Sequence, residues 1–221
     1  MSGLPSAVVF DMDGVIADTE RVSLASFAAA GAELGVELDD GDLADLTGLS
    51  LLRVDALLRE RHDVRFTFDE LRDTYRGRYL AELQRGVVAC PGALELLAAL
   101  AREDVPVAVA SSSPHNQVDI VLASTGAAPY VRAIASGDEV AATKPAPDVY
   151  LLAVERLGGP DARRTVAIED SPAGVAAAVA AGLRCVGVRA GPSQPPLDGA
   201  TAVVSSLEEV TPASLGELAA G

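Results

Sequence analysis

Short apolar runs alternate with longer amphipathic stretches over most of this chain. The apolar runs are rich in valine, isoleucine and alanine, and residues 92–102 and 148–157 between them repeat apolar side chains at helical spacing. Strands that alternate with helices in this way are typical of βαβ units, whose strands lie parallel in one sheet. We expect strands at residues 7–10, 105–110, 133–136, 165–168, 185–188 and 202–204.

The first and second of these strands are separated by a long segment with a different pattern. From about Glu20 to Gly86, leucines and aromatic residues recur at helical spacing, as Leu71, Tyr75 and Tyr79 do, which indicates consecutive helices. The predicted fold is therefore an α/β parallel-sheet core, formed by residues 1–17 and 88–221. An all-helical cap domain at residues 18–87 interrupts this core.

The composition fits a globular protein with a sizeable core. Of the 221 residues 49% are hydrophobic, and no stretch has the pattern of a membrane span or a secretory signal. We therefore expect a cytoplasmic protein with no membrane partner. The formal net charge of −15 repels nucleic acid, so nucleic acid is not an expected partner either. An anionic substrate would need a local cation or a bound metal.

Two acidic residues follow the first expected strand. Asp11 and Asp13 are one residue apart, and Gly14 lets the chain turn after them. Residues i and i+2 of an extended segment point the same way, and open α/β sheets bind ligands beyond the carboxyl ends of their strands. The pair suits phosphoryl chemistry, in which one carboxylate attacks and the other moves a proton. A strand followed by an ordinary turn is the simpler alternative.

Hydroxyl groups and a cation follow later in the chain. Ser111, Ser112 and Ser113 come directly after an expected strand, where hydroxyl and backbone N–H groups suit phosphoryl oxygens, although a serine run is also typical of a plain helix start. Lys144 is the only lysine beside sixteen arginines. A compact ammonium charge differs from a planar guanidinium, so Lys144 is a candidate functional cation; a chance surface lysine is the alternative.

A second pair of acids follows the strand at 165–168. Glu169 and Asp170 form a capping pair in the simplest interpretation, but they add to the acids at the end of the first strand. Carboxylate oxygens on two strands are the hard ligands that Mg²⁺ prefers. The candidate metal ligands are therefore Asp11, Asp13, Glu169 and Asp170.

Four motifs in this order resemble those of the haloacid dehalogenase-like hydrolase superfamily. They are Asp11-Met12-Asp13-Gly14-Val15, Ser111, Lys144-Pro145 and Glu169-Asp170-Ser171. The match covers nearly the whole chain and points to the branch with a helical cap after the first strand, which includes β-phosphoglucomutase-like enzymes and sugar-phosphate phosphatases. The resemblance implies a Rossmann-like core, a mobile cap and Mg²⁺-dependent phosphoryl transfer.

The resemblance also implies catalytic roles for four side chains. Asp11 would be the nucleophile that forms an aspartyl-phosphate. Asp13 would protonate the leaving oxygen and then activate water. Ser111 would bond a phosphoryl oxygen, and Lys144 would neutralise charge.

Mg²⁺ is the cofactor that the resemblance implies. The backbone carbonyl of Met12, Asp170 and, through water, Glu169 would hold it near Asp11. Like charges oppose ionisation of Asp11 beside other carboxylates, and both the metal and Lys144 would offset that repulsion.

Other chemistries of the superfamily fit less well. The related dehalogenases lack the second acid of the first motif, which is present here as Asp13. The related phosphonate hydrolases use a lysine in the cap, and the expected cap of this chain contains no lysine. In the related sugar phosphomutases a histidine lies twelve positions after the nucleophile, where this chain has Ser23. A phosphatase is therefore favoured, and a phosphomutase stays open.

The expected cap contains candidate substrate contacts. Gly48 and Ser50 lie in a segment that resembles the specificity loop of the family, Arg53 is a candidate anion contact, and Glu20 and Ser23 are candidate cleft residues. Ser112 of the core joins them as a candidate substrate-binding residue. Each cap residue also suits a plain solvated or packing position.

The expected activity is Mg²⁺-dependent hydrolysis of a small phosphorylated metabolite, a sugar or sugar-acid phosphate, through an aspartyl-phosphate. A β-phosphoglucomutase-like phosphomutase is the alternative enzyme. From another class, a catalytically silent phosphate-binding or regulatory module remains open. The oligomeric state is open as well, and a monomer is compatible with the sequence.

Overall fold

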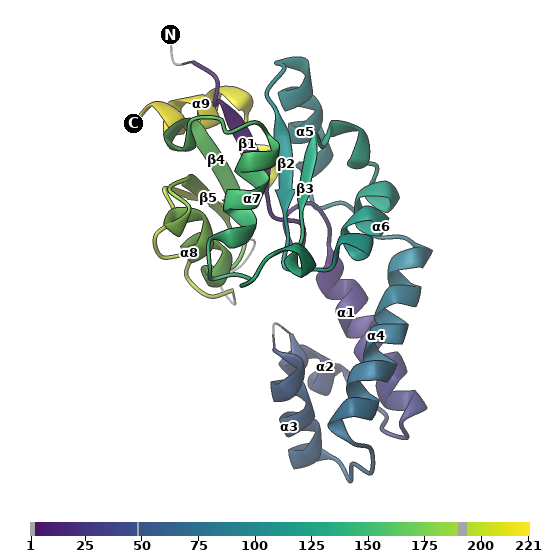
Figure 1. Cartoon of the computed structure of the whole chain (residues 1–221). Helices are drawn as coiled ribbons and strands as arrows, with labels where there is room; N and C mark the ends of the chain where they lie inside the picture. The colour runs from purple at the N-terminus through teal and green to yellow at the C-terminus, as the bar shows by residue number, and fades with distance from the viewer. Residues whose placement is uncertain (1–2, 48, 190–193) are drawn as a thin grey trace. The chain divides into compact units, whose positions relative to one another are not determined.

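The chain divides into two compact units in a computed structural model, which describes residues 3–47, 49–189 and 194–221 (Figure 1). The core unit consists of Met1–Asp18 and Val88–Gly221. The cap unit consists of Thr19–Val87. The cap unit is thus inserted into the core unit after its first strand.

Strand β1 lies near the middle of a parallel sheet in the core unit. The strand order in the described part of the chain is β3-β2-β1-β4-β5-β6, and every neighbouring pair is parallel. Val8 of β1 pairs with Val107 of β2 on one side and with Val166 of β4 on the other. The strands are β1 (Ala7–Phe10), β2 (Val107–Ala110), β3 (Ala133–Ala135), β4 (Thr165–Glu169), β5 (Arg184–Val188) and β6 (Ala202–Val204).

The expected α/β parallel sheet is confirmed, with small differences at the strand ends. The second strand begins at Val107 rather than at residue 105, because Pro106 has no N–H to donate to a neighbouring strand. The fourth continues through Glu169, so that this acid is the last residue of β4 itself. That extra residue places the Glu169 side chain at the edge of the sheet where β1 also ends.

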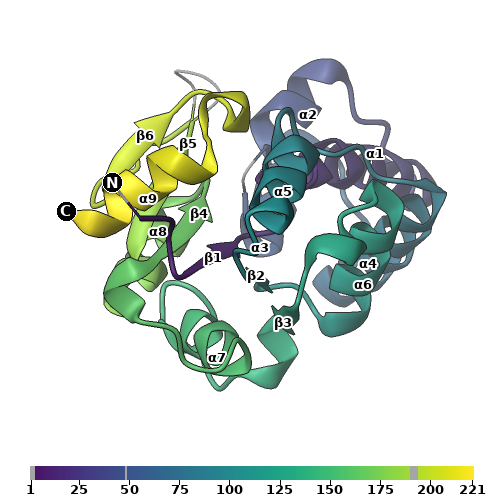
Figure 2. The ribbon, with the colours of Figure 1, turned by 90° about the horizontal axis from the view of Figure 1, so that it is seen from above.

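Helices cover both faces of the sheet (Figure 2). Helices α7 and α8 pack on one face, and α5, α6 and α9 pack on the other. Since β1, β2 and β4 are buried on both faces, their residues are continuously apolar instead of alternating with polar ones. The helices are α5 (Ala93–Arg102), α6 (His115–Thr125), α7 (Asp148–Arg156), α8 (Pro172–Ala180) and α9 (Pro212–Ala220), with short 3₁₀ helices η1 (Ala128–Tyr130), η2 (Gly137–Glu139), η3 (Ala162–Arg164) and η4 (Leu207–Glu209).

The cap unit is all-helical in its described residues, as expected for the insert. Its helices are α1 (Thr19–Glu33), α2 (Asp40–Leu46), α3 (Leu51–Arg61) and α4 (Phe68–Arg85). Phe27, Val54, Leu58 and Leu71 are buried together in a small core of its own. Capping boxes at the starts of α2 and α4 fix where these helices begin.

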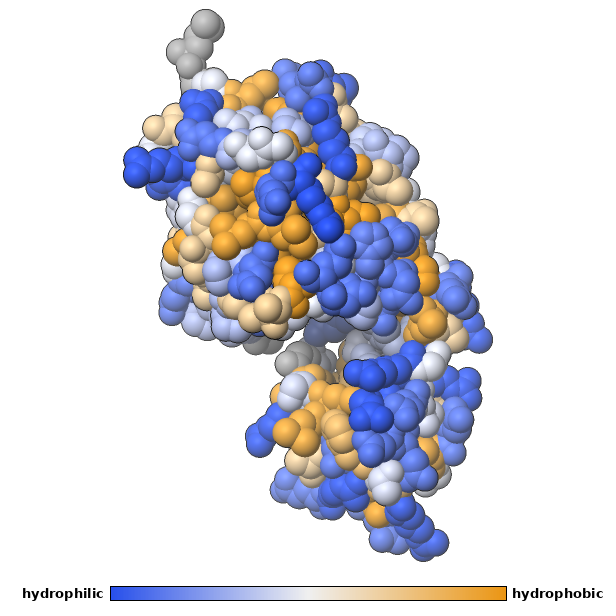
Figure 3. Space-filling model, viewed as in Figure 1, coloured by the Kyte–Doolittle hydropathy of each residue, from blue (hydrophilic) through white to orange (hydrophobic). Residues whose placement is uncertain are grey.

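The surface carries a few exposed hydrophobic residues. In the view of Figure 3, hydrophobic side chains gather around α7 on the core unit, where Leu151 is 50% exposed. Exposed apolar side chains of this number are normal for globular proteins. Among the helices of the described residues, none has both the length and the apolar content that crossing a bilayer requires.

Candidate active site

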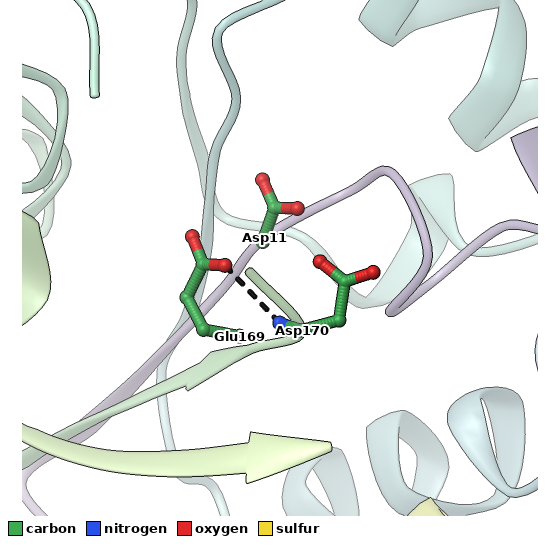
Figure 4. Close-up of side chains that lie close together, drawn as sticks. All are labelled: Asp11, Glu169 and Asp170. Atoms are coloured by element: carbon green, nitrogen blue, oxygen red, sulfur yellow. Dashed lines mark hydrogen bonds between the residues drawn. The ribbon is translucent and has the colours of Figure 1, made fainter. Parts of the chain in front are cut away.

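Three carboxylates gather where strands β1 and β4 end (Figure 4). One oxygen from each of Asp11, Glu169 and Asp170 lies within 4.8 Å of the others. The sheet brings them together because Phe10 and Ile168 are paired on the two strands, and the Asp11 N–H donates to the carbonyl of Ile168 at 2.9 Å. Oxygen donors this close are suited to a hard divalent cation such as Mg²⁺.

A tight turn after β1 makes room for Asp170. Gly14 has a φ of +76°, and a Cβ atom on it would lie 2.0 Å from the Asp170 Oδ2 atom. Only glycine fits this position, for conformational and for steric reasons. The Met12 carbonyl accepts hydrogen bonds from the N–H groups of Ile16 and Ala17 at 3.0 and 3.1 Å. These two bonds engage both lone pairs of the Met12 carbonyl, so this oxygen does not fit the expected role of a metal ligand.

Lys144 lies between two of the carboxylates. Its Nζ atom is 2.5 Å from the Oδ1 atom of Asp11 and 2.6 Å from the Oε1 atom of Glu169. The Lys144 side chain is 7% exposed, that of Asp11 is 9% exposed and that of Glu169 is fully buried. Desolvated charges are stable only when they are paired, which explains why the lone lysine of the chain lies here and not on the surface.

The charges of the site shift the pKa values of several groups. Burial raises the pKa of Asp11 well above its usual range; Lys144 opposes that rise, and Glu169, Asp13 and Asp170 add to it. Burial and then the charge of Glu169 raise the pKa of Asp170 to about 7. Burial alone would lower the pKa of Lys144, but the charges of Asp11 and Glu169 outweigh burial and raise it. Three carboxylates lie close to the single ammonium group of Lys144, so a divalent cation fits this cluster.

Glu169 is held on both of its oxygens. Its Oε1 atom accepts hydrogen bonds from Lys144 at 2.6 Å and from the hydroxyl of the fully buried Tyr150 at 2.8 Å. Its Oε2 atom accepts from the N–H groups of Asp170 and Ser171 and from the Ser171 hydroxyl at 3.1 to 3.3 Å. With five protein donors, Glu169 is better suited to position Lys144 and to reach a metal through water than to bind a metal directly.

The start of α8 is shaped around this glutamate. The Ser171 hydroxyl caps the helix by accepting a hydrogen bond from the Gly174 N–H at 3.0 Å, as the Ser-Pro pattern predicts. A Cβ atom on Gly174 would lie 1.8 Å from the Glu169 Oε1 atom. The glycine thus allows the carboxylate to lie against the N-terminal end of the helix, where the helix dipole favours negative charge.

Asp13 faces the serine loop, which we define as residues 111–113. The hydroxyl of Ser113 donates to the Oδ2 atom of Asp13 at 3.1 Å, and the hydroxyl of the fully buried Ser111 is 3.4 Å from the same oxygen. The Ser111 hydroxyl also accepts a hydrogen bond from the Ser113 N–H at 3.0 Å. Ser112 is exposed between them. The structure therefore brings the second acid of the first motif together with the serine loop.

The cap candidates lie in the cap unit. Glu20 is exposed in the first turn of α1, and the Ser23 hydroxyl is 3.0 Å from the hydroxyl of Tyr75. Ser50 is the N-cap residue of α3, and Arg53 is exposed on that helix. Gly48 lies outside the described residues.

The sequence did not reveal two contacts of the site, that of Ser113 with Asp13 and that of Tyr150 with Glu169. Ser113 belongs to the same serine run as Ser111, and its position at i+2 was the signal that it shares a partner with Ser111. Tyr150 follows a proline-rich helix start and has the pattern of an ordinary core aromatic residue. No local signal distinguishes it, because its hydroxyl meets Glu169 only after α7 packs on the sheet.

Comparison with known proteins identifies the family. The sequence profile of the haloacid dehalogenase-like hydrolases matches residues 8–188. Protein CbbY of Rhodobacter capsulatus is 34% identical over 194 residues, which are 81% of this chain and 83% of that protein. Validoxylamine A 7′-phosphate phosphatase of Streptomyces hygroscopicus subsp. limoneus is 29% identical over 91% of this chain and 94% of that protein.

A longer plant protein contains a similar segment. Protein SUPPRESSOR OF QUENCHING 1, chloroplastic, of Arabidopsis thaliana is 36% identical over 192 residues, which are 85% of this chain. The chain spans 18% of the length of that relative. The likeness therefore concerns one segment of the plant protein.

Solved structures share the fold. A haloacid dehalogenase family hydrolase of Deinococcus radiodurans R1 with bound phosphate and sodium has a TM-score of 0.78 at 33% identity, covering 98% of this chain and 97% of that chain. A variant of CbbY from Rhodobacter sphaeroides in complex with xylulose-(1,5)bisphosphate has a TM-score of 0.76 at 28% identity, covering 93% and 96%. For β-phosphoglucomutase of Clostridium difficile the TM-score is 0.76 at 22% identity, covering 98% of each chain, a likeness of fold alone.

The family match and the structures agree with the resemblance found in the sequence. The expected Rossmann-like core with a helical cap is confirmed, and the phosphatase among the relatives supports the prediction that this enzyme is a phosphatase. The chain belongs to the haloacid dehalogenase-like hydrolases.

Proposed function

We propose that this protein is a Mg²⁺-dependent phosphatase that hydrolyses a small sugar or sugar-acid phosphate through an aspartyl-phosphate. The observation that carries the proposal is the contact of 2.5 Å between the Lys144 ammonium and the Asp11 carboxylate, among further acids at the ends of β1 and β4. The Lys144 ammonium beside this carboxylate could neutralise the charge of an anionic substrate. Phosphoryl transfer needs positioning and charge neutralisation above all.

The proposed metal ligands come from the acidic cluster. Asp11 and Asp170 would bind the ion, with Asp13 beside them and Glu169 reaching it through water. The raised pKa values of Asp11 and Asp170 support this assignment, because burial and then the neighbouring carboxylates oppose their ionisation, and a bound cation would offset both effects. Bound Mg²⁺ supplies charge neutralisation for the phosphoryl oxygens.

The side chains of the core unit perform two steps in this proposal. An Asp11 oxygen attacks phosphorus and forms a P–O bond, while the bond from phosphorus to the ester oxygen breaks and its electron pair stays on the leaving oxygen. Asp13 gives its proton to that oxygen. Asp13 then takes a proton from water, whose oxygen attacks phosphorus as the bond to Asp11 breaks. Inorganic phosphate and free Asp11 result.

Three residues hold the substrate phosphoryl group in this scheme. Lys144 neutralises its charge, and the Ser111 hydroxyl with the exposed Ser112 offers hydrogen-bond donors at the end of β2. Glu20, Ser23, Gly48, Ser50 and Arg53 of the cap remain proposed contacts to the rest of the substrate. The relative that binds xylulose-(1,5)bisphosphate supports a sugar phosphate as the substrate class.

Release of inorganic phosphate tests this function. The purified protein is given Mg²⁺ and a panel of glucose 6-phosphate, glucose 1-phosphate, ribose 5-phosphate, xylulose 5-phosphate and p-nitrophenyl phosphate. We expect turnover of at least one sugar phosphate, and a loss of at least about 1,000-fold in Asp11→Asn because the nucleophile is removed. Asp198→Asn changes an exposed aspartate of the same unit and should retain full activity.

Two outcomes would contradict the proposal. Full turnover by Asp11→Asn would remove Asp11 as the nucleophile. Binding of phosphate without turnover of any ester would favour a silent phosphate-binding module.

A sugar phosphomutase is the second candidate, because solved mutases share the fold. Ser23 stands where the related mutases have a histidine, and its hydroxyl contacts Tyr75 within the cap unit. We therefore expect β-glucose 1-phosphate to yield free phosphate or no product. Formation of glucose 6-phosphate from it would establish the mutase instead.

A further inference from the structure

The serine loop at residues 111–113 makes a contact with Asp13 that the proposed chemistry has not used. We propose that Ser113 is a positioning residue that orients the Asp13 carboxyl group for proton transfer, an inference that rests on the proposed phosphatase function. The Ser113 hydroxyl donates to the Oδ2 atom of Asp13 at 3.1 Å. Serine at this position would therefore act through Asp13 and not on phosphate.

Ser113 is the better placed of the two serines that reach Asp13. The Ser111 hydroxyl lies 3.4 Å from the same oxygen, which is long for a hydrogen bond between two oxygens, and it also accepts from the Ser113 N–H at 3.0 Å. The Ser113 hydroxyl makes the shorter contact. The Ser113 hydroxyl thus holds Asp13, and the Ser111 hydroxyl is left to bind phosphate.

The backbone around Ser113 is anchored, so its hydroxyl can hold another group in place. The Ser113 carbonyl accepts a hydrogen bond from the Gly137 N–H at 3.0 Å, and the His115 N–H donates to the Asp138 carboxylate at 3.1 Å. A Cβ atom on Gly137 would lie 2.1 Å from the Ser112 carbonyl oxygen. The turn after β3 therefore packs directly against the serine loop.

The buried side chain of Ser136 stabilises the turn after β3. The fully buried Ser136 bonds through its hydroxyl to the carboxylates of Asp138 at 2.7 Å and Glu139 at 2.6 Å. Arg156 of α7 pairs with Glu139 at 2.8 Å. Helix α7, β3 and the serine loop are thereby linked by hydrogen bonds, and this is the rigid support that a positioning residue needs.

Orientation matters because Asp13 must face a particular leaving oxygen. A carboxyl group rotates about its Cβ–Cγ bond, and the hydrogen bond from Ser113 to Oδ2 restricts that rotation. When Asp11 attacks phosphorus, the proton of Asp13 moves to the ester oxygen as the P–O bond breaks. A misdirected carboxyl group slows this transfer only where the leaving oxygen needs the proton.

The leaving group therefore provides the test. Ser113→Ala is compared with wild type on p-nitrophenyl phosphate, whose phenolate leaves without a proton, and on the sugar phosphate of the panel that wild type hydrolyses fastest. The first turnover is followed with enzyme in excess, as release of the sugar or of p-nitrophenolate, because this release comes before Asp13 activates water. We expect its rate on the sugar phosphate to fall about 10-fold or more, and its rate on p-nitrophenyl phosphate to change less than about 3-fold. Ser113→Thr retains the hydroxyl and should restore most of the loss.

A double variant separates positioning from a general structural effect. Asp13→Ala removes the group through which Ser113 acts, so adding Ser113→Ala to it should cause no further loss of kcat. Ser205→Ala replaces an exposed serine and serves as the matched control. Thermal unfolding of each variant shows that the fold is retained.

The results distinguish this inference from the proposed function. If wild type hydrolyses no ester, the proposed function itself fails. If wild type is active but Ser113→Ala slows release of the leaving group in the first turnover equally for both esters, or adds its full loss in the Asp13→Ala background, the positioning role of Ser113 is overturned while the phosphatase stands.

Discussion

At the scale of single residues, the site depends on a buried ion cluster whose parts cannot be removed one at a time. Lys144 contacts Asp11 and Glu169 at 2.5 and 2.6 Å, and both partners are almost inaccessible to solvent. Removing one member of such a cluster leaves the others as buried, uncompensated charges. Lys144 was predicted from the sequence, because it is the one lysine of the chain and stands in the Lys144-Pro145 motif. Glu169 was predicted only as a metal ligand; its contacts with Lys144 and with the hydroxyl of Tyr150 are known from the folded structure.

Lys144→Arg tests whether a compact ammonium group is required. A guanidinium is larger and planar, so it does not fit between the two carboxylates in the same geometry. We expect kcat/KM for the preferred phosphate ester to fall at least about 100-fold, since charge stabilisation of the transferred group is lost. Arg163→Lys makes the reverse exchange on the exposed surface and should leave activity unchanged. Full activity in Lys144→Arg would show that any cation suffices.

At the scale of secondary-structure elements, the strand ends determine the site. β1 and β4 are direct neighbours, so their terminal acids meet, and β2 brings the serine loop to the other side of β1. This much could be predicted, because parallel strands end at a common edge of the sheet. The contact between the serine loop and the turn after β3 could not. It depends on the absence of a Cβ atom at Gly137, which no local pattern marks.

The link between β3 and α7 should make stability depend on pH. Hydrogen bonds from Arg156 and then Ser136 lower the pKa of Glu139 in the folded protein. In the unfolded chain the pKa of a glutamate is about 4.3. Because the pKa of Glu139 is lower in the folded protein, its ionised carboxylate stabilises the fold above about pH 4.3, and this contribution is lost as the pH falls toward the folded-state pKa. The free energy of unfolding of wild type should therefore exceed that of Glu139→Gln most at neutral pH, and the difference should shrink below pH 4.

Chemical unfolding of both proteins across this pH range measures the difference. Glu95→Gln, a change at a carboxylate in the first turn of α5, is the control for the loss of one negative charge. A difference that stays constant with pH would show that the Glu139 contacts do not favour its ionised form.

At the scale of the whole molecule, a net charge of −15 surrounds a site for an anionic substrate. Repulsion at long range is screened by salt, whereas the buried carboxylates near Asp11 are screened much less. The family and the fold could be predicted from the sequence, because three of the four motifs lie at the ends of regular strands and the fourth, Lys144-Pro145, precedes α7. The substrate contacts of the cap could not. Glu20, Ser50 and Arg53 have the pattern of solvated helix residues, and their chemistry depends on a substrate.

The proposed metal should stabilise the folded molecule. Without Mg²⁺, burial raises the pKa of Asp170 to about 7 in the folded protein, whereas the pKa of an aspartate in an unfolded chain is about 3.9. The free energy of unfolding therefore falls as the pH rises from about 3.9 to about 7. Added Mg²⁺ should raise Tm by a few degrees at pH 7.5, relative to sodium chloride of equal ionic strength. Asp170→Asn should unfold no earlier than metal-free wild type and should not respond to Mg²⁺. An equal response in both proteins would contradict a metal site at Asp170.

The central claim is that Asp11 is phosphorylated during turnover. Mixing enzyme, Mg²⁺ and the preferred phosphate ester for milliseconds, followed by acid quench, digestion and mass spectrometry, tests it most directly. We expect the peptide containing Asp11 to gain the mass of one phosphoryl group during turnover, and Asp11→Asn to show no such peptide. A steady release of phosphate with an unmodified Asp11 peptide at every time point would contradict it.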